Sequence, residues 1–260
     1  MPSPRSKTPL NSNFKSDEGT APALSRAFEK KGEDSIATPA AAEMSEDLAL
    51  AAFEHGDLTA SDLAALARTP CALKSRKVML ALATHPRTPR HSSIPLVRRM
   101  FTFDLMQVAL TPAVPADLKR LAEGLILVRL GALSAGEKIS LARRASGRVA
   151  AELLLDPDSR IVAAALDNSR LTEVLLDAAL ANDNAPQALF DMASAHNTWA
   201  QRHDVQIALL RSEKTPLDKV RGFANNFSAD FLDEILPEST RSALRDRQLG
   251  GDDPAKDSAG

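Results

Sequence analysis

The chain has 260 residues, 44% of them hydrophobic and 25% charged, and a net charge of −2, as in a water-soluble globular protein of one domain or two small ones. The single cysteine, Cys71, excludes an intramolecular disulfide. The Ser/Pro-rich start lacks the apolar run of a secretory signal. The most apolar stretch, 121–133, is too short and too charged to span a bilayer. These features predict a cytoplasmic protein.

The chain divides into three expected regions. Residues 1–42 combine prolines, serines and charges with apolar residues too scattered to bury a face, which predicts a disordered segment. Residues 250–260 are rich in Gly and Asp and predict a flexible tail. Between them, 43–249 forms a single helical domain, since Ala and Leu dominate its apolar residues and no window alternates as a strand does.

Apolar residues at helical spacing predict individual helices along this domain. A Ser-x-x-Glu pattern, with Glu137 three residues after Ser134, predicts a capping box at one helix start. Three expected helices cover 43–54, 72–83 and 116–130. Two more begin after the expected caps Thr59, which has Asp62 three residues later, and Ser134.

A short oxygen-bearing side chain followed by proline recurs along the chain and predicts helix starts, with the oxygen as cap and the proline as first helical residue. The pairs are Thr69-Pro70, Thr88-Pro89, Thr111-Pro112, Asp156-Pro157 and Thr215-Pro216. Two interleaved series of starts, one led by Pro70 and one by Thr88, have intervals of 38 to 46 residues. Such intervals are typical of repeats of two helices.

The chain resembles the HEAT/armadillo superfamily over about residues 44 to 248. Two turns, 83–89 and 166–172, look alike, and an Asp-Pro followed by Arg and small apolar residues is typical of such repeats. That stretch reads Leu155-Asp156-Pro157-Asp158-Ser159-Arg160-Ile161-Val162-Ala163-Ala164-Ala165-Leu166. The resemblance implies an all-α fold, a short α-solenoid of stacked antiparallel helix pairs, which in this superfamily mostly binds proteins and in a minority of cases nucleic acid.

No pattern of residues predicts catalysis, a metal site or a cofactor. Glycine-rich phosphate loops and the Gly-x-Ser-x-Gly elbow are absent from the sequence. His196 and His203, seven residues apart, would share a helix face but have no third ligand nearby. The stretch 182–184 resembles only a fragment of a calcium loop. Cys71 stands at an expected helix start, where a thiol pKa can be lowered, but it has no histidine partner. We expect no enzyme.

Charge is distributed unevenly along the chain. The range 68–148 carries 15 Lys/Arg and 4 Asp/Glu, whereas 1–67 carries 6 and 11, and 149–260 carries 11 and 19. A basic middle between acidic flanks bears on partners rather than on fold. Our candidate residues for binding an anionic partner are Arg87, Arg90, Arg98, Arg99, Lys119, Arg120, Arg143 and Arg144.

Three functions remain open at this stage. The first is a non-catalytic protein-interaction module or scaffold, with no small-molecule ligand. The second is a nucleic-acid-binding protein, including the HEAT-like DNA glycosylases, which use aromatic residues in a cleft around an acidic residue. One Trp and no Tyr in the chain weigh against that family. The third is a self-associating structural protein. Basic residues that converge on one concave face would favour the second, and scattered ones the first.

Overall fold

The structure is a computed structural model that describes residues 45–54 and 58–249. All regular elements in these two ranges are helical: sixteen α-helices, α2 to α17, and two 3-10 helices. Both terminal regions expected from the sequence, 1–42 and 250–260, lie outside the described residues. Within the described part, no helix has both the length and the apolar character needed to cross a membrane.

The helices are short, and prolines or polar turn residues separate most of them. In the first half of the chain they are α2 (Glu46–Glu54), α3 (Ala60–Leu66), α4 (Pro70–Lys74), α5 (Arg76–Thr84), α6 (Arg90–Arg99), α7 (Thr102–Leu110), α8 (Ala116–Arg129), η1 (Leu130–Ala132) and α9 (Ala135–Arg144). In the second half they are α10 (Gly147–Leu153), α11 (Ser159–Leu166), α12 (Glu173–Leu180), α13 (Gln187–Ala195), η2 (Trp199–Gln201), α14 (His203–Leu210), α15 (Leu217–Ala224), α16 (Ala229–Ile235) and α17 (Glu238–Leu249).

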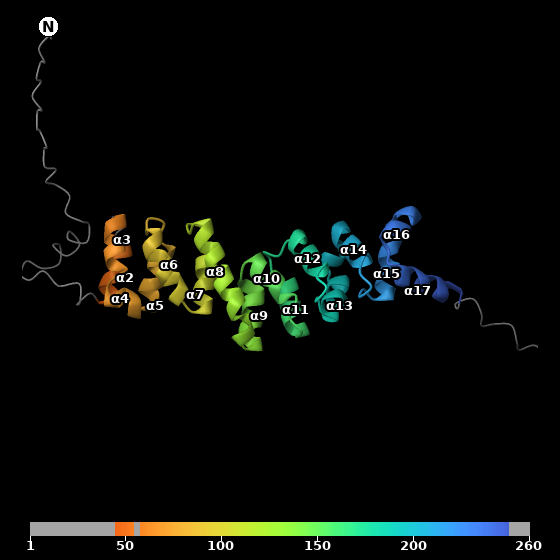
Figure 1. Ribbon diagram of the computed structural model, residues 1–260, viewed down its shortest axis with the longest axis horizontal. Helices are drawn as coiled ribbons and strands as arrows, with labels where there is room; N and C mark the ends of the chain where they lie inside the picture. Colours follow the sequence, from red (N-terminus) through yellow and green to blue (C-terminus); the bar gives the residue numbers. More distant parts are fainter. Residues whose placement is uncertain (1–44, 55–57, 250–260) are drawn as a thin grey trace, which may run out of the picture.

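The helices follow one another in chain order along the long axis of an elongated molecule, from α2 at one end to α17 at the other (Figure 1). Contacts are correspondingly local. Along much of the row, a helix packs against the helix two places further on: α5 against α7, α6 against α8, α10 against α12, α11 against α13 and α12 against α14. The core is therefore a continuous strip of buried side chains rather than a central sphere, and it extends from Ala49 to Leu236.

Small side chains allow these short helices to approach closely. Ala122, Ala142 and Ala165 are fully buried, next to larger residues such as Leu141 and Ile161. Alternating small and large residues let neighbouring helices interdigitate without leaving voids. The Ala/Leu-rich composition thus accounts for helix formation and for the packing between helices.

Several local predictions are confirmed. Thr59 and Ser134 are N-caps with complete capping boxes, and the acidic partners are Asp62 and Glu137. The helix expected over 116–130 is α8. The helix expected over 72–83 is wrong, because it is divided into α4 and α5 at Ser75. Ser75 has an extended backbone, and its hydroxyl accepts the N–H of Val78, so it ends one helix and caps the next.

The expected repeat intervals are also wrong. Helices two places apart begin 26 residues apart for α5 and α7, 26 for α6 and α8, and 28 for α11 and α13. These intervals are well below those expected from the prolines. Pro112 and Pro157 lie in turns before their helices, so they do not mark equivalent helix starts.

The Thr-Pro pairs act differently from the prediction. Only Thr69 caps a following helix, by accepting the N–H of Ala72. At Thr88-Pro89 and Thr215-Pro216 the proline is itself the N-cap residue, without a side-chain hydrogen bond. The threonine hydroxyls instead donate backward to carbonyls six residues earlier, those of Leu82 and Leu209, at 2.7 and 2.6 Å. The other two pairs also differ: Thr111 is the C-cap of α7, and Asp158 rather than Asp156 caps α11.

Hydrogen bonds between successive turns connect the row. The last carbonyls of an α-helix have no partner inside the helix, and short helices have a large share of such carbonyls. Many of them accept a side-chain donor that follows 23 to 33 residues later in the chain. Arg129 donates to the carbonyl of Met100, Asn168 to those of Ala142 and Ala145, and Trp199 to that of Leu166. Lys214 donates in the same way to two carbonyls of the turn between α12 and α13, those of Asp183 and Ala185.

Asn168 makes the most buried of these connections. Its Nδ2 donates to the carbonyl oxygens of Ala142 at 2.6 Å and Ala145 at 3.1 Å, at the end of α9. Its Oδ1 accepts the N–H of Arg170 at 2.8 Å, which shapes the turn after α11. The residue is 2% exposed, so water cannot replace it.

The turn after α11 also presses against the start of α10. A Cβ atom built on Gly147 would overlap the carbonyl oxygen of Arg170, and this obstacle is backbone, which cannot rotate away. Gly124, inside α8, has no atom within 4 Å of such a Cβ. Close approach of two backbones therefore explains glycine at 147 and does not explain it at 124.

We predict that Asn168→Ala lowers the free energy of unfolding by about 2–4 kcal/mol, because it leaves two buried carbonyls and one N–H without partners. Asn182→Ala is the matched control. Asn182 accepts only the exposed N–H of Asn184, so its loss costs below about 1 kcal/mol. Urea unfolding followed by circular dichroism measures both values, and equal losses would contradict the special role of Asn168.

We also predict opposite effects of alanine at two glycines. Gly147→Ala destabilises by about 1–3 kcal/mol, because the backbones of two turns must move apart. Gly124→Ala stabilises by about 0.5–1 kcal/mol, because alanine favours a helix interior and meets open space. The same unfolding experiment reports both signs, and a neutral Gly147→Ala would show that the two turns are not packed as described.

Candidate interaction surface

The metal-ligating side chains do not cluster in the described part of the chain. No three His, Cys, Asp or Glu side chains there are placed to hold a metal ion. The expectation that His196 and His203 share a helix face is wrong, because His196 ends α13 and His203 begins α14. Nε2 of His196 lies 3.3 Å from Asp167, and the ring of His203 packs on Phe227.

Cys71 and His85 have shifted pKa values with structural causes. Burial, and then the negative charge of Glu46, raises the pKa of the Cys71 thiol, although a helix start can lower a thiol pKa. Burial, and then the charge of Arg87, lowers the pKa of His85. Its neutral ring ends α5 and accepts the N–H of Arg87 at Nδ1. These features fit a turn residue and an unreactive thiol.

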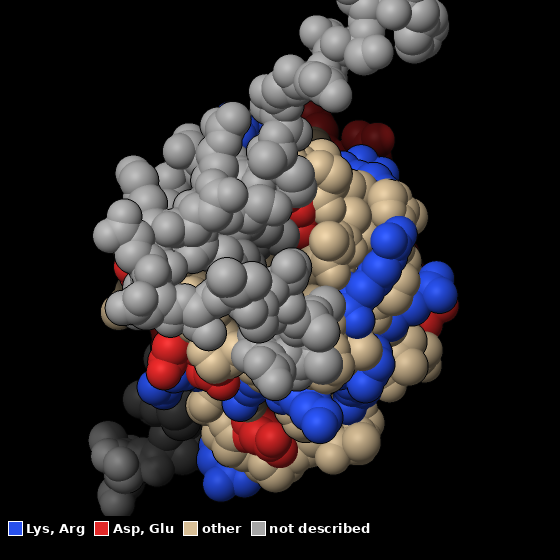
Figure 2. Space-filling model, turned by 90° about the vertical axis from the view of Figure 1, so that its left-hand side faces the viewer, with Lys and Arg blue, Asp and Glu red and all other residues tan. Residues whose placement is uncertain are grey.

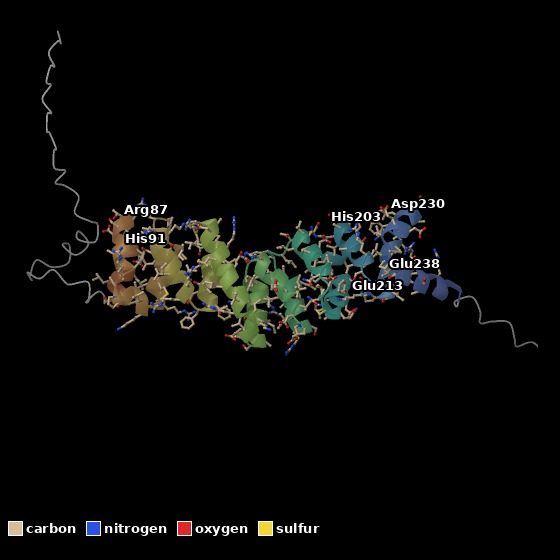
Figure 3. The ribbon with its side chains drawn as sticks, in the orientation of Figure 1. Arg87, His91, His203, Glu213, Asp230 and Glu238 are labelled. Atoms are coloured by element: carbon tan, nitrogen blue, oxygen red, sulfur yellow. The ribbon has the colours of Figure 1, made fainter. Side chains whose placement is uncertain are left out.

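The structure divides the basic candidates between the two ends of α6. Arg87 and Arg90 lie at its start, and Figure 3 shows Arg87 near His91 at the outer margin there. Arg98 and Arg99 lie at its end, about 12 Å further along the helix axis at 1.5 Å per residue. The candidates near α6 therefore form two groups, one at each end of the helix.

The group at the start of α6 is mostly engaged in local contacts. Arg90 forms an ion pair with Asp117 at 2.9 Å. Arg87 donates to the carbonyl of Leu58 at 3.5 Å, and Lys119 donates to that of Pro112 at 3.3 Å. Arg120 is exposed beside them. These side chains help to connect neighbouring helices, so some of their hydrogen-bond donors and charges are not available to a binding partner.

The group at the end of α6 surrounds a turn with exposed aromatic and basic side chains. We call it the basic turn and define it as Arg76, Arg98, Arg99, Phe101, Phe103 and Arg144. The Phe101 side chain is 68% exposed. The guanidinium of Arg76 lies over the Phe101 ring at 5.3 Å, and that of Arg144 over the Phe103 ring at 6.0 Å. Arg144 thus comes from α9 to a turn between α6 and α7.

The local fold holds the basic turn in place. Met100 is buried and ends α6, while Phe101 is the N-cap residue of α7. Arg129, from the end of α8, donates to the carbonyls of Met100 and Arg98 at 2.6 and 3.3 Å. Because the backbone is held from both sides, Arg98, Arg99 and Phe101 are presented on a fixed support.

The basic turn carries an excess of positive charge. The acidic side chain paired with it in the described part of the chain, Asp104, is buried and bonded to Arg76 at 2.6 Å, so that carboxylate is already neutralised. Hydrogen bonding to Asp104 raises the pKa of Arg76, which stays charged. Arg98, Arg99 and Arg143 are exposed and form no ion pair with another described residue. Figure 2, which looks onto the end of the molecule next to α2, shows Lys and Arg atoms along one margin of the described surface.

Toward the other end of the molecule, the second half of the described chain (149–249) has an excess of negative charge, with 16 Asp/Glu and 10 Lys/Arg. Figure 3 shows Glu213, Asp230 and Glu238 near that end, around α14 to α17. The sequence therefore predicted the separation of charge along the chain, and the elongated fold turns it into a separation in space. Phe101 was not predicted as part of the surface.

Comparison with protein-family models, with curated proteins and with solved structures finds no match for this chain. Its function is therefore inferred from the positions and contacts of its own residues.

We predict that Arg76→Ala lowers the free energy of unfolding by about 1–2 kcal/mol, because it leaves the carboxylate of Asp104, 6% exposed, without its charged partner. Lys77→Ala is the control at the next position. Lys77 is 77% exposed and lies 3.5 Å from Glu46, so its removal changes stability by less than about 0.5 kcal/mol. Thermal and urea unfolding of both variants test the difference, and a neutral Arg76→Ala would show that Asp104 does not need its partner.

Proposed function

We propose that this chain is a non-catalytic protein-interaction module built as a HEAT-like α-solenoid of antiparallel helix pairs, and that its basic turn binds an acidic protein segment. The architectural part is supported by packing between helices two places apart in the row and by helix starts that recur at similar intervals. A stack of this kind exposes the turns between helices along its edges, where they can meet a partner.

One observation carries the binding proposal: Phe101 is 68% exposed and lies among arginines that form few ion pairs. Arginine and aromatic side chains are enriched among the residues that dominate protein interfaces. Guanidinium groups pair with carboxylates in a defined planar geometry, and an exposed ring supplies apolar area beside them. A segment with Asp or Glu next to a large apolar residue has matching chemistry.

Nucleic acid is the alternative partner for the same charges. A protein partner is favoured because the basic residues divide into two groups, whereas proteins bind a phosphate backbone with a continuous row of cations. In addition, both aromatic rings of this turn are already covered by a guanidinium, Phe101 by Arg76 and Phe103 by Arg144, so neither is open for stacking on a base.

The experiment compares a fluorescein-labelled Glu/Asp-rich peptide containing leucines with a single-stranded oligonucleotide of similar length. Anisotropy titrations use the full chain at low and physiological ionic strength. We expect saturable binding of the peptide that Arg98→Glu/Arg99→Glu weakens about tenfold, which corresponds to about 1.4 kcal/mol, less than close interfacial charge pairs measure. Phe101→Ala weakens it without a change in net charge.

Lys119→Glu/Arg120→Glu is the matched control, with the same change in charge inside the same basic segment but at the other group. We expect peptide binding within about twofold of the unmodified chain, because screening at physiological salt limits the effect of distant charges. Equal losses in the two double variants would contradict a site at the basic turn. Tight binding of the oligonucleotide alone would establish the nucleic-acid function instead.

A further inference from the structure

The acidic half of the molecule contains an open groove between α12 and α14. Two adjoining cavities of about 330 and 430 Å³ lie along it and share Asp177, Ala208 and Arg211. Val174, on the exposed side of α12, is 78% exposed at one edge. We call this feature the α12–α14 groove and define it as Glu173, Val174, Asp177, Asp204, Ala208 and Arg211.

The groove combines apolar surface with charged side chains of both signs. Val174 and Ala208 supply the apolar surface, and the exposed side chains of Asp177, Asp204 and Arg211 line the same groove. Arg211 forms no ion pair with a described residue, so the two aspartates exceed it by one negative charge. Glu173 is already paired with Arg202 across the neighbouring turn, so it is held in position but contributes little free charge. Asp177 forms no ion pair with a described residue, and Asp204 lies only near His203, at 3.6 Å. A ligand that fits needs an apolar group flanked by cations.

The basic turn of the same chain presents that combination. Phe101 is exposed, carries the guanidinium of Arg76 over its ring, and directly follows Met100 and the exposed Arg98 and Arg99 in the chain. A cavity of about 330 Å³ is at the lower end of the range that holds small-molecule ligands, so a single aromatic side chain fits within it. Within one chain the two features lie in different halves of an elongated row, α6–α7 and α12–α14 (Figure 1). They can therefore meet only between two copies.

Resting on the proposed role of the basic turn as a binding site, we infer that its partner is a second copy of this chain. Phe101 of one copy occupies the α12–α14 groove of the next, while Arg98 and Arg99 face Asp177 and Asp204. Two different surfaces meet, so the contact is head-to-tail, and each added copy still offers one free surface of each kind. The contact is small and charged, which makes the association weak and sensitive to salt.

Sedimentation velocity over a range of protein concentrations tests this inference with the full chain. We expect the average mass to rise with concentration at low salt and to fall toward the monomer at high salt. Arg98→Glu/Arg99→Glu and Asp177→Lys/Asp204→Lys should each weaken self-association about tenfold or more. Asp218→Lys/Asp233→Lys, with the same charge change at two exposed positions outside the groove, should associate like the unmodified chain. Circular dichroism melting confirms that each variant is folded.

Mixing the two defective variants gives the decisive result. One keeps an intact groove and the other an intact basic turn, and the new glutamates of the first also complement the new lysines of the second. Together they should therefore associate in alternation and restore the rise in average mass with concentration that neither variant shows alone. Combining all four substitutions in one chain exchanges the charges of the two surfaces and should restore concentration-dependent association. A monomeric unmodified chain at all concentrations at low salt, or a control variant as defective as the groove variant, would overturn the inference.

Failure of this inference can be told apart from failure of the proposed function. Asp177→Lys/Asp204→Lys keeps the basic turn, so it should still bind the acidic peptide as the unmodified chain does. A monomeric chain that binds the peptide overturns self-association and leaves the binding site in place. A chain that associates through the groove without binding the peptide would mean that the basic turn recognises only this folded surface.

Discussion

The fold depends on the treatment of helix ends. Helices of 5 to 14 residues leave many carbonyls without an intrahelical partner, and a buried carbonyl without a partner costs free energy of the same order as a lost hydrogen bond. Asn168, Trp199, Arg129 and Lys214 each supply a donor to an earlier turn. Each of these hydrogen bonds connects two successive turns of the row. The same bonds therefore satisfy helix-end carbonyls and hold neighbouring helices together. The threonines at 88 and 215 do the same within a turn.

This constraint also shapes the candidate surface. Arg129 satisfies the carbonyls that end α6 and thereby fixes the backbone from which Arg98 and Arg99 project. The shape of the basic turn therefore depends on hydrogen bonds that also support the fold. Phe101 is exposed there because it is the N-cap residue just outside α7. An arrangement that is rigid before binding loses less conformational entropy on association than a mobile loop does.

The parts of the fold that sequence predicted are those set by neighbouring residues. The capping boxes at Thr59 and Ser134 need only residues three apart, and the helical content follows from Ala and Leu. The repeat interval was mispredicted because proline marks a change of direction without showing which turn it belongs to. The residues that do define the interval, Asn168 and Trp199, act on carbonyls 23 to 33 residues away, which no local pattern reveals.

The division of the basic residues into two groups follows from the boundaries of α6, which Pro89 and Met100 set. Phe101 was not among the candidate residues, and its exposure depends on the backbone at the start of α7. Its backbone is extended rather than helical, and its side chain turns outward.

An elongated row has a consequence for partners that a compact fold lacks. In a sphere, basic and acidic segments of one chain can neutralise each other across the surface, whereas here residues near α6 and residues near α14 are held apart by the intervening helices (Figure 1). Several basic side chains form ion pairs, but their acidic partners come from neighbouring helices or turns of the row. Examples are Arg76 with Asp104, Arg90 with Asp117 and Arg202 with Glu173. The charges left over at Arg98 and Arg99, and at Asp177, have no such neighbour among the described residues. They are available to another molecule, and a second copy of this chain carries charges of both signs.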